Sequence, residues 1–146
     1  MMRIGFTYDL RDDYRAIGFD EEAIAEFDSP ETIDEIAAAL TRLGFNIDRI
    51  GHVKALAARL VAGERWDLVF NIAEGLKGRS REAQVPALLE AYDVPYVFSD
   101  PLTLAVSLDK AVAKQIVRDA GIPTAAFAVA RQMADVAAGE SNELDS

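Results

Sequence analysis

The sequence predicts an α/β fold with three layers, in which helices cover both faces of a mainly parallel sheet. Strand-like and helix-like segments alternate along the chain, which is the order that βαβ units produce. The run Asp67-Leu-Val-Phe-Asn71 is apolar throughout its centre, as is typical of a strand buried on both faces. With 146 residues, 51% of them hydrophobic, the chain is long enough for one ordinary domain with its own core.

In the first half of the chain, the clearest helix signal begins at Ser29. The serine can cap a helix, Pro30 suits the first turn, and Glu31 favours the positive end of the helix dipole. Gly44 offers the left-handed residue that often ends a helix. The elements expected here are a strand at residues 3–8, an acidic loop, a helix at residues 29–43, a strand near residues 45–50 and a short helix at residues 53–63.

The second half continues the same alternation from the strand at residues 67–71. Its last long helix should close at Gly121 and Pro123, because neither residue continues a helix well. Residues 139–146 are polar and acidic, and we expect them to form a disordered tail. The other elements expected are a helix at residues 81–92, a strand at residues 95–99, a helix at residues 107–121 and a last strand at residues 127–130.

Charge and composition exclude several classes of function. The net charge is −10, and residues 1–35 hold eleven acidic against three basic side chains, so this segment should be a solvated acidic surface that repels nucleic acid. His52 is the single histidine and there is no cysteine, so no metal site is predicted. No apolar stretch approaches the roughly 20 residues that span a bilayer. We therefore expect a soluble, cytoplasmic protein without a membrane partner.

The loop at residues 72–80 is the best candidate for a binding site. In open α/β sheets ligands bind beyond the carboxyl ends of the strands, and this loop follows such an end. Gly75 and Gly78 permit a tight backbone path, and Arg79, Ser80 and Arg81 stand where a helix begins, an arrangement suited to a carboxylate or phosphate. An ordinary capped loop with solvated arginines fits the same spacing, so both interpretations stay open.

The helix at residues 107–121 carries a row of cations. Lys110, Lys114 and Arg118 recur every four residues and share one face, which by default is a solvated basic face. Lys110 differs because it lies in the first turn, where a cation opposes the helix dipole and where free amides are expected. A bound phosphate would offset that cost.

An ordered set of motifs resembles the N-terminal part of the D-alanine–D-alanine ligase family of ATP-grasp enzymes. The set covers roughly residues 67–124 and is far more specific than any one of its members. Its members are Phe70-Asn71, Glu74-Gly75-x-x-Gly78, Gln84, Leu88-Leu-Glu90, Val94-Pro-Tyr96, Ser99, Ser107-Leu-Asp-Lys110 and Gly121-Ile-Pro123.

The resemblance implies a function and a division of the chain. Family members join a carboxylate, activated by ATP as an acyl phosphate, to an amine, so ATP and Mg²⁺ are implied for the complete enzyme, as is a homodimer. It assigns Lys110 to a phosphate of ATP. It also implies a Rossmann-like pre-ATP-grasp domain at residues 1–106, the start of the segment leading to the ATP-grasp core at residues 107–138, and a tail at residues 139–146.

The chain departs from the family at the substrate positions. Family ligases carry His-Gly where this chain has Glu74-Gly75, and Gly-Glu-Asp-Gly where it has Gly78-Arg-Ser-Arg81. Their Ser-x-Glu segment has no counterpart at residues 9–13. We therefore take Glu74, Gly75, Arg79, Ser80 and Arg81 as the substrate-binding residues, and a segment with two arginines where the family's segment has two acids suits a more anionic amino acid or other small carboxylate. No catalytic residue is identified.

Two other functions stay open at this point. The family's adenine-binding and metal-binding regions lie downstream of the position reached by Ser146, so we expect the chain to be inactive alone; a non-catalytic binding or dimerisation module on the same scaffold is the first alternative. The second is a receiver-like signalling domain, which Asp12-Asp13, Ser99 and Lys110 imitate in part. Asn71 stands where such a domain needs its phosphoacceptor aspartate.

Overall fold

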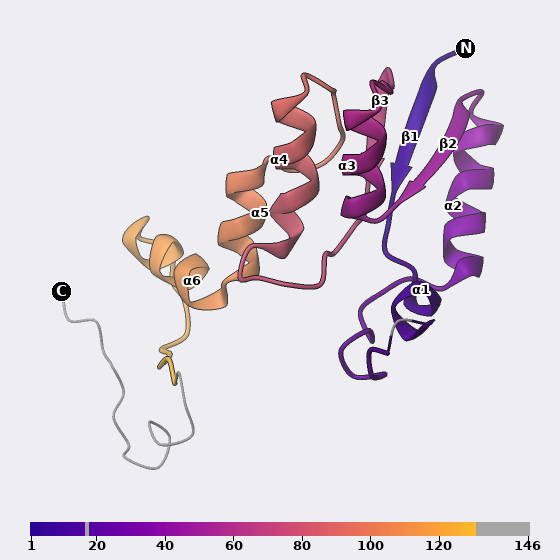
Figure 1. Ribbon diagram of the computed structural model, residues 1–146. Coiled ribbons are helices and arrows are strands. Elements are labelled where there is room, and N and C mark those ends of the chain that lie inside the picture. The colour runs from indigo at the N-terminus through magenta and orange to yellow at the C-terminus, as the bar shows by residue number, and fades with distance from the viewer. Residues whose placement is uncertain (17, 131–146) are drawn as a thin grey trace. The chain divides into compact units, whose positions relative to one another are not determined.

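The computed structural model describes residues 1–16 and 18–130 (Figure 1). The chain divides into two compact units, residues 1–105 and residues 106–146, and each is described by itself. The expected tail at residues 139–146 lies outside the described residues. Within the described ranges, no helix is long and apolar enough to cross a membrane.

The first unit is built on a parallel sheet of three strands. These are β1 (Arg3–Thr7), β2 (Asn46–Gly51) and β3 (Leu68–Asn71), in the order β2-β1-β3. Ile4 of the central strand pairs with Ile47 on one side and Leu68 on the other. The three strands run in one direction, so their carboxyl ends meet at one edge.

One face of the sheet is covered by α2 (Pro30–Arg42). The helix begins as the sequence predicts, because the Ser29 hydroxyl accepts a hydrogen bond from the amide of Thr32 at 3.3 Å. Its buried residues Ile33 and Ala37 pack on Phe6 and Tyr8. Burying a side chain such as Ile33 contributes about 1.5–3 kcal/mol relative to leaving it exposed.

The opposite face is covered by α3 (Val53–Val61) and α4 (Gln84–Ala91), the latter preceded by a short 3₁₀ turn, η1 (Arg81–Ala83). Helices on both faces confirm the predicted three-layer α/β fold. The core on this side consists of buried apolar residues from the helices, the strands and their connections: Ile50, Leu56, Leu60, Trp66, Val69, Ala73, Val85, Leu89 and Val94.

The segment after β1 is more ordered than an acidic loop. It forms the short helix α1 (Arg11–Ala16), and its apolar side chains Tyr14, Ile24 and Phe27 make a small buried cluster of their own. A parallel bridge joins Leu10 to Asp28. The acidic residues of this segment therefore surround a packed centre.

The strand expected at residues 95–99 is reduced to one bridge between Val69 and Tyr96. The Val69 amide donates to the Pro95 carbonyl at 2.8 Å, and the Val97 amide donates to the Val69 carbonyl at 3.0 Å. Phe98 then takes a φ of 77°, outside the strand region, so the pairing stops there.

The helix expected at residues 107–121 is interrupted at Asp109. α5 (Pro101–Leu108) ends just before it, and α6 (Lys110–Asp119) begins just after it. Asp109 caps α6 with an extended backbone, which breaks the helical path. Residues 127–130 carry no strand, so that expectation is wrong; among the residues described, the sheet has no partner strand for them.

A charged network lies beside the start of β1. The Asp48 carboxylate accepts hydrogen bonds from Arg3 at 2.5 Å, from Arg59 at 2.7 and 2.9 Å, and from the indole of Trp66 at 2.9 Å. The guanidinium of Arg59 also stacks over the Trp66 ring at 5.0 Å. Hydrogen bonds from Arg59, Trp66 and Arg3 lower the pKa of Asp48 to about 2.

Candidate functional site

The carboxyl edge of the sheet is held by a buried pair of polar side chains. The Thr7 hydroxyl donates to Asn71 Oδ1 at 2.8 Å, and the amide of Ala73 donates to the same oxygen at 3.2 Å. Thr7 and Asn71 are both buried. Asn71 therefore fixes the turn by which the chain leaves β3 and enters the candidate loop.

Asp9 connects this loop to the segment after β1. Its side chain is buried, with 2% of the residue exposed. One carboxylate oxygen accepts from the Tyr14 hydroxyl at 2.5 Å, and the other accepts from the amide of Gly75 at 2.8 Å. Sequence reasoning missed this residue, because the contact with Gly75 spans 66 positions and leaves no local signal.

Gly75 is required by its surroundings. Its φ is 68°, and an added Cβ would lie 2.7 Å from the carbonyl oxygen of Arg81. Any side chain would therefore strain the backbone and displace the first turn of the following helix. The close approach folds the loop back so that Glu74 and Arg81 come near each other.

Glu74 and Arg81 belong to a cluster of charged side chains. Burial raises the pKa of Glu74, the neighbouring carboxyl groups of Glu82 and Glu26 raise it further, and Arg81 lowers it. Arg81 donates to Glu26 at 2.5 Å, and its own side chain is 23% exposed. The guanidinium of Arg81 is thus already paired with a carboxylate of the acidic segment.

The predicted substrate residues lie together in this one loop. Gly75 is buried, Glu74 and Arg81 are half-buried, and Arg79 and Ser80 are exposed. A hollow of about 430 Å³ opens beside the loop, and its lining includes Gly75, Arg81, Glu22 and Glu26. The loop therefore combines an exposed arginine, a half-buried arginine and a carboxyl group whose pKa is raised by burial.

Lys110 lies in the second unit, as the first residue of α6, and its side chain is exposed. The side chain of Asp109 accepts hydrogen bonds from the amides of Ala111 at 3.1 Å and Val112 at 3.2 Å. The expectation of free amides beside Lys110 is wrong for these two. The group that remains suited to a phosphate is the ammonium of Lys110 itself.

Lys114 is half-buried, whereas a lysine on a solvated basic face is expected to be exposed. Its ammonium lies 5.2 Å from the centre of the Phe127 ring. Lys110 and Lys114 therefore differ in environment, although they are four residues apart on one helix.

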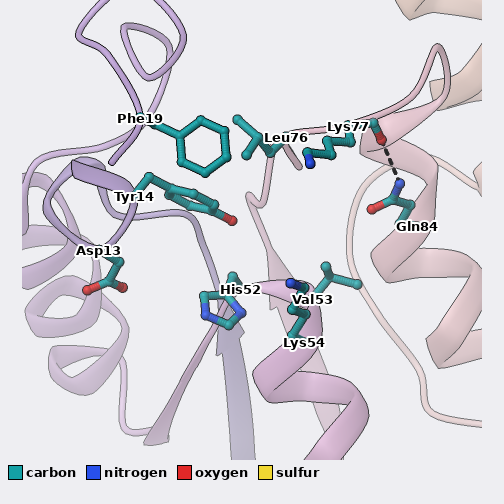
Figure 2. Close-up of a pocket in the computed structure, with 9 residues that line it drawn as sticks. All are labelled: Asp13, Tyr14, Phe19, His52, Val53, Lys54, Leu76, Lys77 and Gln84. Carbon is teal, nitrogen blue, oxygen red and sulfur yellow. Dashed lines mark hydrogen bonds between the residues drawn. The ribbon is translucent and has the colours of Figure 1, made fainter. Parts of the chain in front are cut away.

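A second hollow of about 410 Å³ opens at the same edge of the first unit (Figure 2). Segments that follow all three strands form its walls. Sequence reasoning did not identify it, since its residues are scattered over 72 positions. They are Asp13, Tyr14, Phe19, His52, Val53, Lys54, Leu76, Lys77 and Gln84.

Tyr14 and His52 occupy the centre of this pocket wall. The Tyr14 ring lies 6.0 Å from that of Phe19 and 6.2 Å from that of His52. Burial and the hydrogen bond to Asp9 raise the pKa of Tyr14 well above its usual value, so the phenol stays protonated. His52 Nδ1 accepts the amide of Ala55 at 3.3 Å and caps α3, which leaves Nε2 as the other polar atom of the ring.

Within residues 1–16 and 18–130, no cluster of three or more His, Cys, Asp or Glu side chains is arranged to hold a metal ion. The described residues do not fit Mg²⁺, and we assign it no position. The Lys110 ammonium is the group that the resemblance assigns to a phosphate of ATP, and its exposed position leaves room for such a contact.

Comparison with known proteins confirms the predicted resemblance. No family model matches the chain. The D-alanine–D-alanine ligase of Xylella fastidiosa is 37% identical over 93 residues, which is 64% of this chain and 30% of that protein. The corresponding ligase of Aquifex aeolicus is 36% identical over 96 residues, or 66% of this chain and 32% of that protein.

Two further proteins are similar to this chain. An uncharacterized protein of Sinorhizobium fredii, y4sG, is 45% identical over 65 residues, covering 44% of this chain and 19% of that protein. The crystal structure of the Bacillus anthracis D-alanine–D-alanine ligase shares the fold, with a TM-score of 0.54 and 20% identity over 93% of this chain and 42% of that one.

The fold and sequence thus define an α/β chain similar to D-alanine–D-alanine ligases. The similarity in sequence covers about a third or less of the length of these curated relatives.

Proposed function

We propose that this chain is the N-terminal, substrate-side domain of an ATP-dependent ligase that joins a small carboxylate to an amine. The similarity to D-alanine–D-alanine ligases supports this class of reaction. The observation that carries the proposal is the hydrogen bond between Asp9 and the Gly75 amide, which fixes residues 74–81 at the carboxyl edge of the sheet. Ligands of open α/β folds gather at that edge.

In this proposal the loop binds and orients the substrate. Arg79 and Ser80 are the exposed groups that reach a substrate carboxylate, and Arg81, held by Glu26, sets the shape of the loop. Burial raises the pKa of Glu74, so it keeps its proton to a higher pH than an exposed glutamate does, and the protonated form can donate to a substrate oxygen. As pH rises, Glu74 loses that proton and repels an anionic substrate.

Lys110 is the residue that we assign to nucleotide. Its exposed ammonium, in the first turn of α6, would contact a phosphate of ATP. ATP with Mg²⁺ would supply the phosphoryl group that activates the carboxylate. We propose that this chain does not ligate by itself, and that the ligase acts in the cytoplasm as a homodimer.

The substrate role is tested by calorimetry with D-alanine, the amino acid in the relatives' names, and the folded chain. We expect Arg79→Ala to weaken binding by about 1.5–3 kcal/mol, because it removes a hydrogen bond to a charged group. Arg42→Ala, on the exposed last turn of α2, is the matched control and should leave binding unchanged. Equal affinities for Arg79→Ala and the wild type would mean that the loop is an ordinary solvated turn without a role in substrate binding.

The nucleotide role is tested by titrating a non-hydrolysable ATP analogue in the same way. Lys110→Ala should weaken binding by about 1.5–3 kcal/mol, and Lys114→Ala, whose ammonium lies over Phe127, by under about 1 kcal/mol. Equal losses for the two lysines would show that α6 has only a general basic face.

A further inference from the structure

The pocket in Figure 2 shares Leu76 and Lys77 with the loop to which we assign the substrate, but it faces different side chains. None of the predicted site residues lines it. We propose that it binds a small carboxylate with one negative charge and an aromatic or branched apolar body. The proposal concerns residues 1–105 alone and does not depend on ligase activity.

The volume and the walls fit an apolar body. At about 410 Å³ the pocket lies within the range of small-molecule sites. Figure 2 shows Tyr14, Phe19 and Leu76 along one side, with His52 and Val53 opposite them. The Tyr14 and Phe19 rings pack edge to face, at an interplanar angle of 77°, and form the aromatic part of this wall, which suits a flat or branched apolar group.

The cations of the pocket fit a single negative charge. Lys54 and Lys77 are both exposed, and neither forms an ion pair with another residue of the part of the chain that the structure describes. Asp13 is the one carboxylate in the lining. Two lysines and one aspartate give a charge of +1 with His52 neutral, which complements a carboxylate better than a phosphate dianion.

The polar atoms of the pocket favour an acceptor group on the ligand. His52 uses Nδ1 to cap α3, so its neutral form carries the ring proton at Nε2 and donates. The side-chain amide of Gln84 donates a hydrogen bond to the Lys77 carbonyl at 2.9 Å, which fixes the backbone of the loop at Lys77 (Figure 2). The Tyr14 hydroxyl donates to Asp9 and is not available as a donor. A carboxylate between Lys54, Lys77 and His52 therefore meets three donors.

The test uses the 146-residue chain and phenylacetate as the probe. Binding is measured by calorimetry and by chemical shifts of the amides of Lys54 and Leu76. We expect phenylacetate to bind with a Kd on the order of 1 mM or tighter, given its size. Phenylacetamide, which has the same shape without charge, should bind about tenfold more weakly, and acetate, which lacks the ring, should not saturate.

Variants distinguish binding in the pocket from non-specific attraction by positive charge. Lys54→Gln with Lys77→Gln should weaken phenylacetate binding about tenfold. Lys114→Gln changes the net charge by one unit at a residue outside the pocket and should leave phenylacetate binding unchanged. D-alanine at saturating concentration should also leave phenylacetate binding unchanged. Circular dichroism confirms that each variant is folded.

Three results would overturn the proposal. The first is no saturable binding of phenylacetate up to about 10 mM. The second is equal binding of phenylacetamide, or an equal loss in the folded Lys114→Gln variant. The third is tighter binding of phenyl phosphate than of phenylacetate, which would assign the pocket to a phosphate. Each of them leaves the D-alanine and nucleotide titrations, and thus the proposed function, to be decided separately.

Discussion

At the scale of single residues, two carboxylates, Asp9 and Asp48, have different structural roles. Asp9 is buried and joins the segment after β1 to the loop after β3 through Tyr14 and Gly75. Asp48 lies within β2 and accepts hydrogen bonds from two arginines and an indole. Asp9 shapes the site, whereas Asp48 ties the start of β1 to α3.

Asp48 should make stability depend on pH. Its pKa in the folded state is lowered from 3.8 to about 2, so its contribution is complete above the unfolded pKa and is lost as pH falls from about 4 to 2. With its side chain 21% exposed, we expect a contribution of about 1–2 kcal/mol after screening by solvent. Urea unfolding followed by the fluorescence of Trp66, the single tryptophan, measures it.

Asp48→Asn is the comparison that isolates this residue. The variant should be less stable than the wild type at pH 7, and the difference should shrink as pH approaches 2. A difference that stays constant over this range would mean that Asp48 titrates alike in the folded and unfolded states.

At the scale of elements, local signals predicted some helix starts and not others. Ser29 and Pro30 gave the beginning of α2 correctly. An equivalent signal precedes α5, where the Asp100 carboxylate accepts a hydrogen bond from the amide of Thr103 at 2.9 Å, although no helix was predicted there. The interruption of the helix at Asp109 was not predicted either. The sequence around Asp109 is compatible with a continuous helix, and only the capping hydrogen bonds of its side chain show that a new helix begins there.

Long-range contacts explain the rest of what the sequence did not predict. The order within residues 11–28 depends on a cluster of Tyr14, Ile24 and Phe27, whose spacing has neither the helical nor the strand period. The pocket of Figure 2 needs segments from after three different strands. The loop at residues 74–81 was found because its glycines and arginines are adjacent in sequence.

Gly75 allows a prediction at this scale. Gly75→Ala should cost about 2–4 kcal/mol, since a Cβ meets the Arg81 carbonyl at 2.7 Å and the φ of 68° is already unfavourable. Gly44→Ala is the matched control: its φ is 91°, but nothing lies within 4 Å of the added atom, so about 1 kcal/mol is expected. Thermal unfolding measures both, and equal losses would show that the approach to Arg81 is not tight.

At the scale of the whole molecule, the residues to which we assign roles lie in different segments of the chain. The sheet and its two helical layers hold the ends of three strands at one edge. The loop at residues 74–81 and the pocket of Figure 2 both open at that edge, within residues 1–105. Lys110 belongs to the second unit. The net charge of −10 makes a small cationic site stand out as a local exception on an acidic surface.

The most direct test of the central claim is to locate the bound substrate by NMR. The ¹⁵N-labelled chain is titrated with D-alanine at pH 6 while the backbone amides are followed. The account predicts saturable shifts concentrated at residues 74–81, including Gly75 and Gly78, and their reduction by Arg79→Ala. A folded chain whose amides in this loop do not move, while shifts are absent or lie elsewhere, would contradict the assignment of this domain to the substrate side of a ligase.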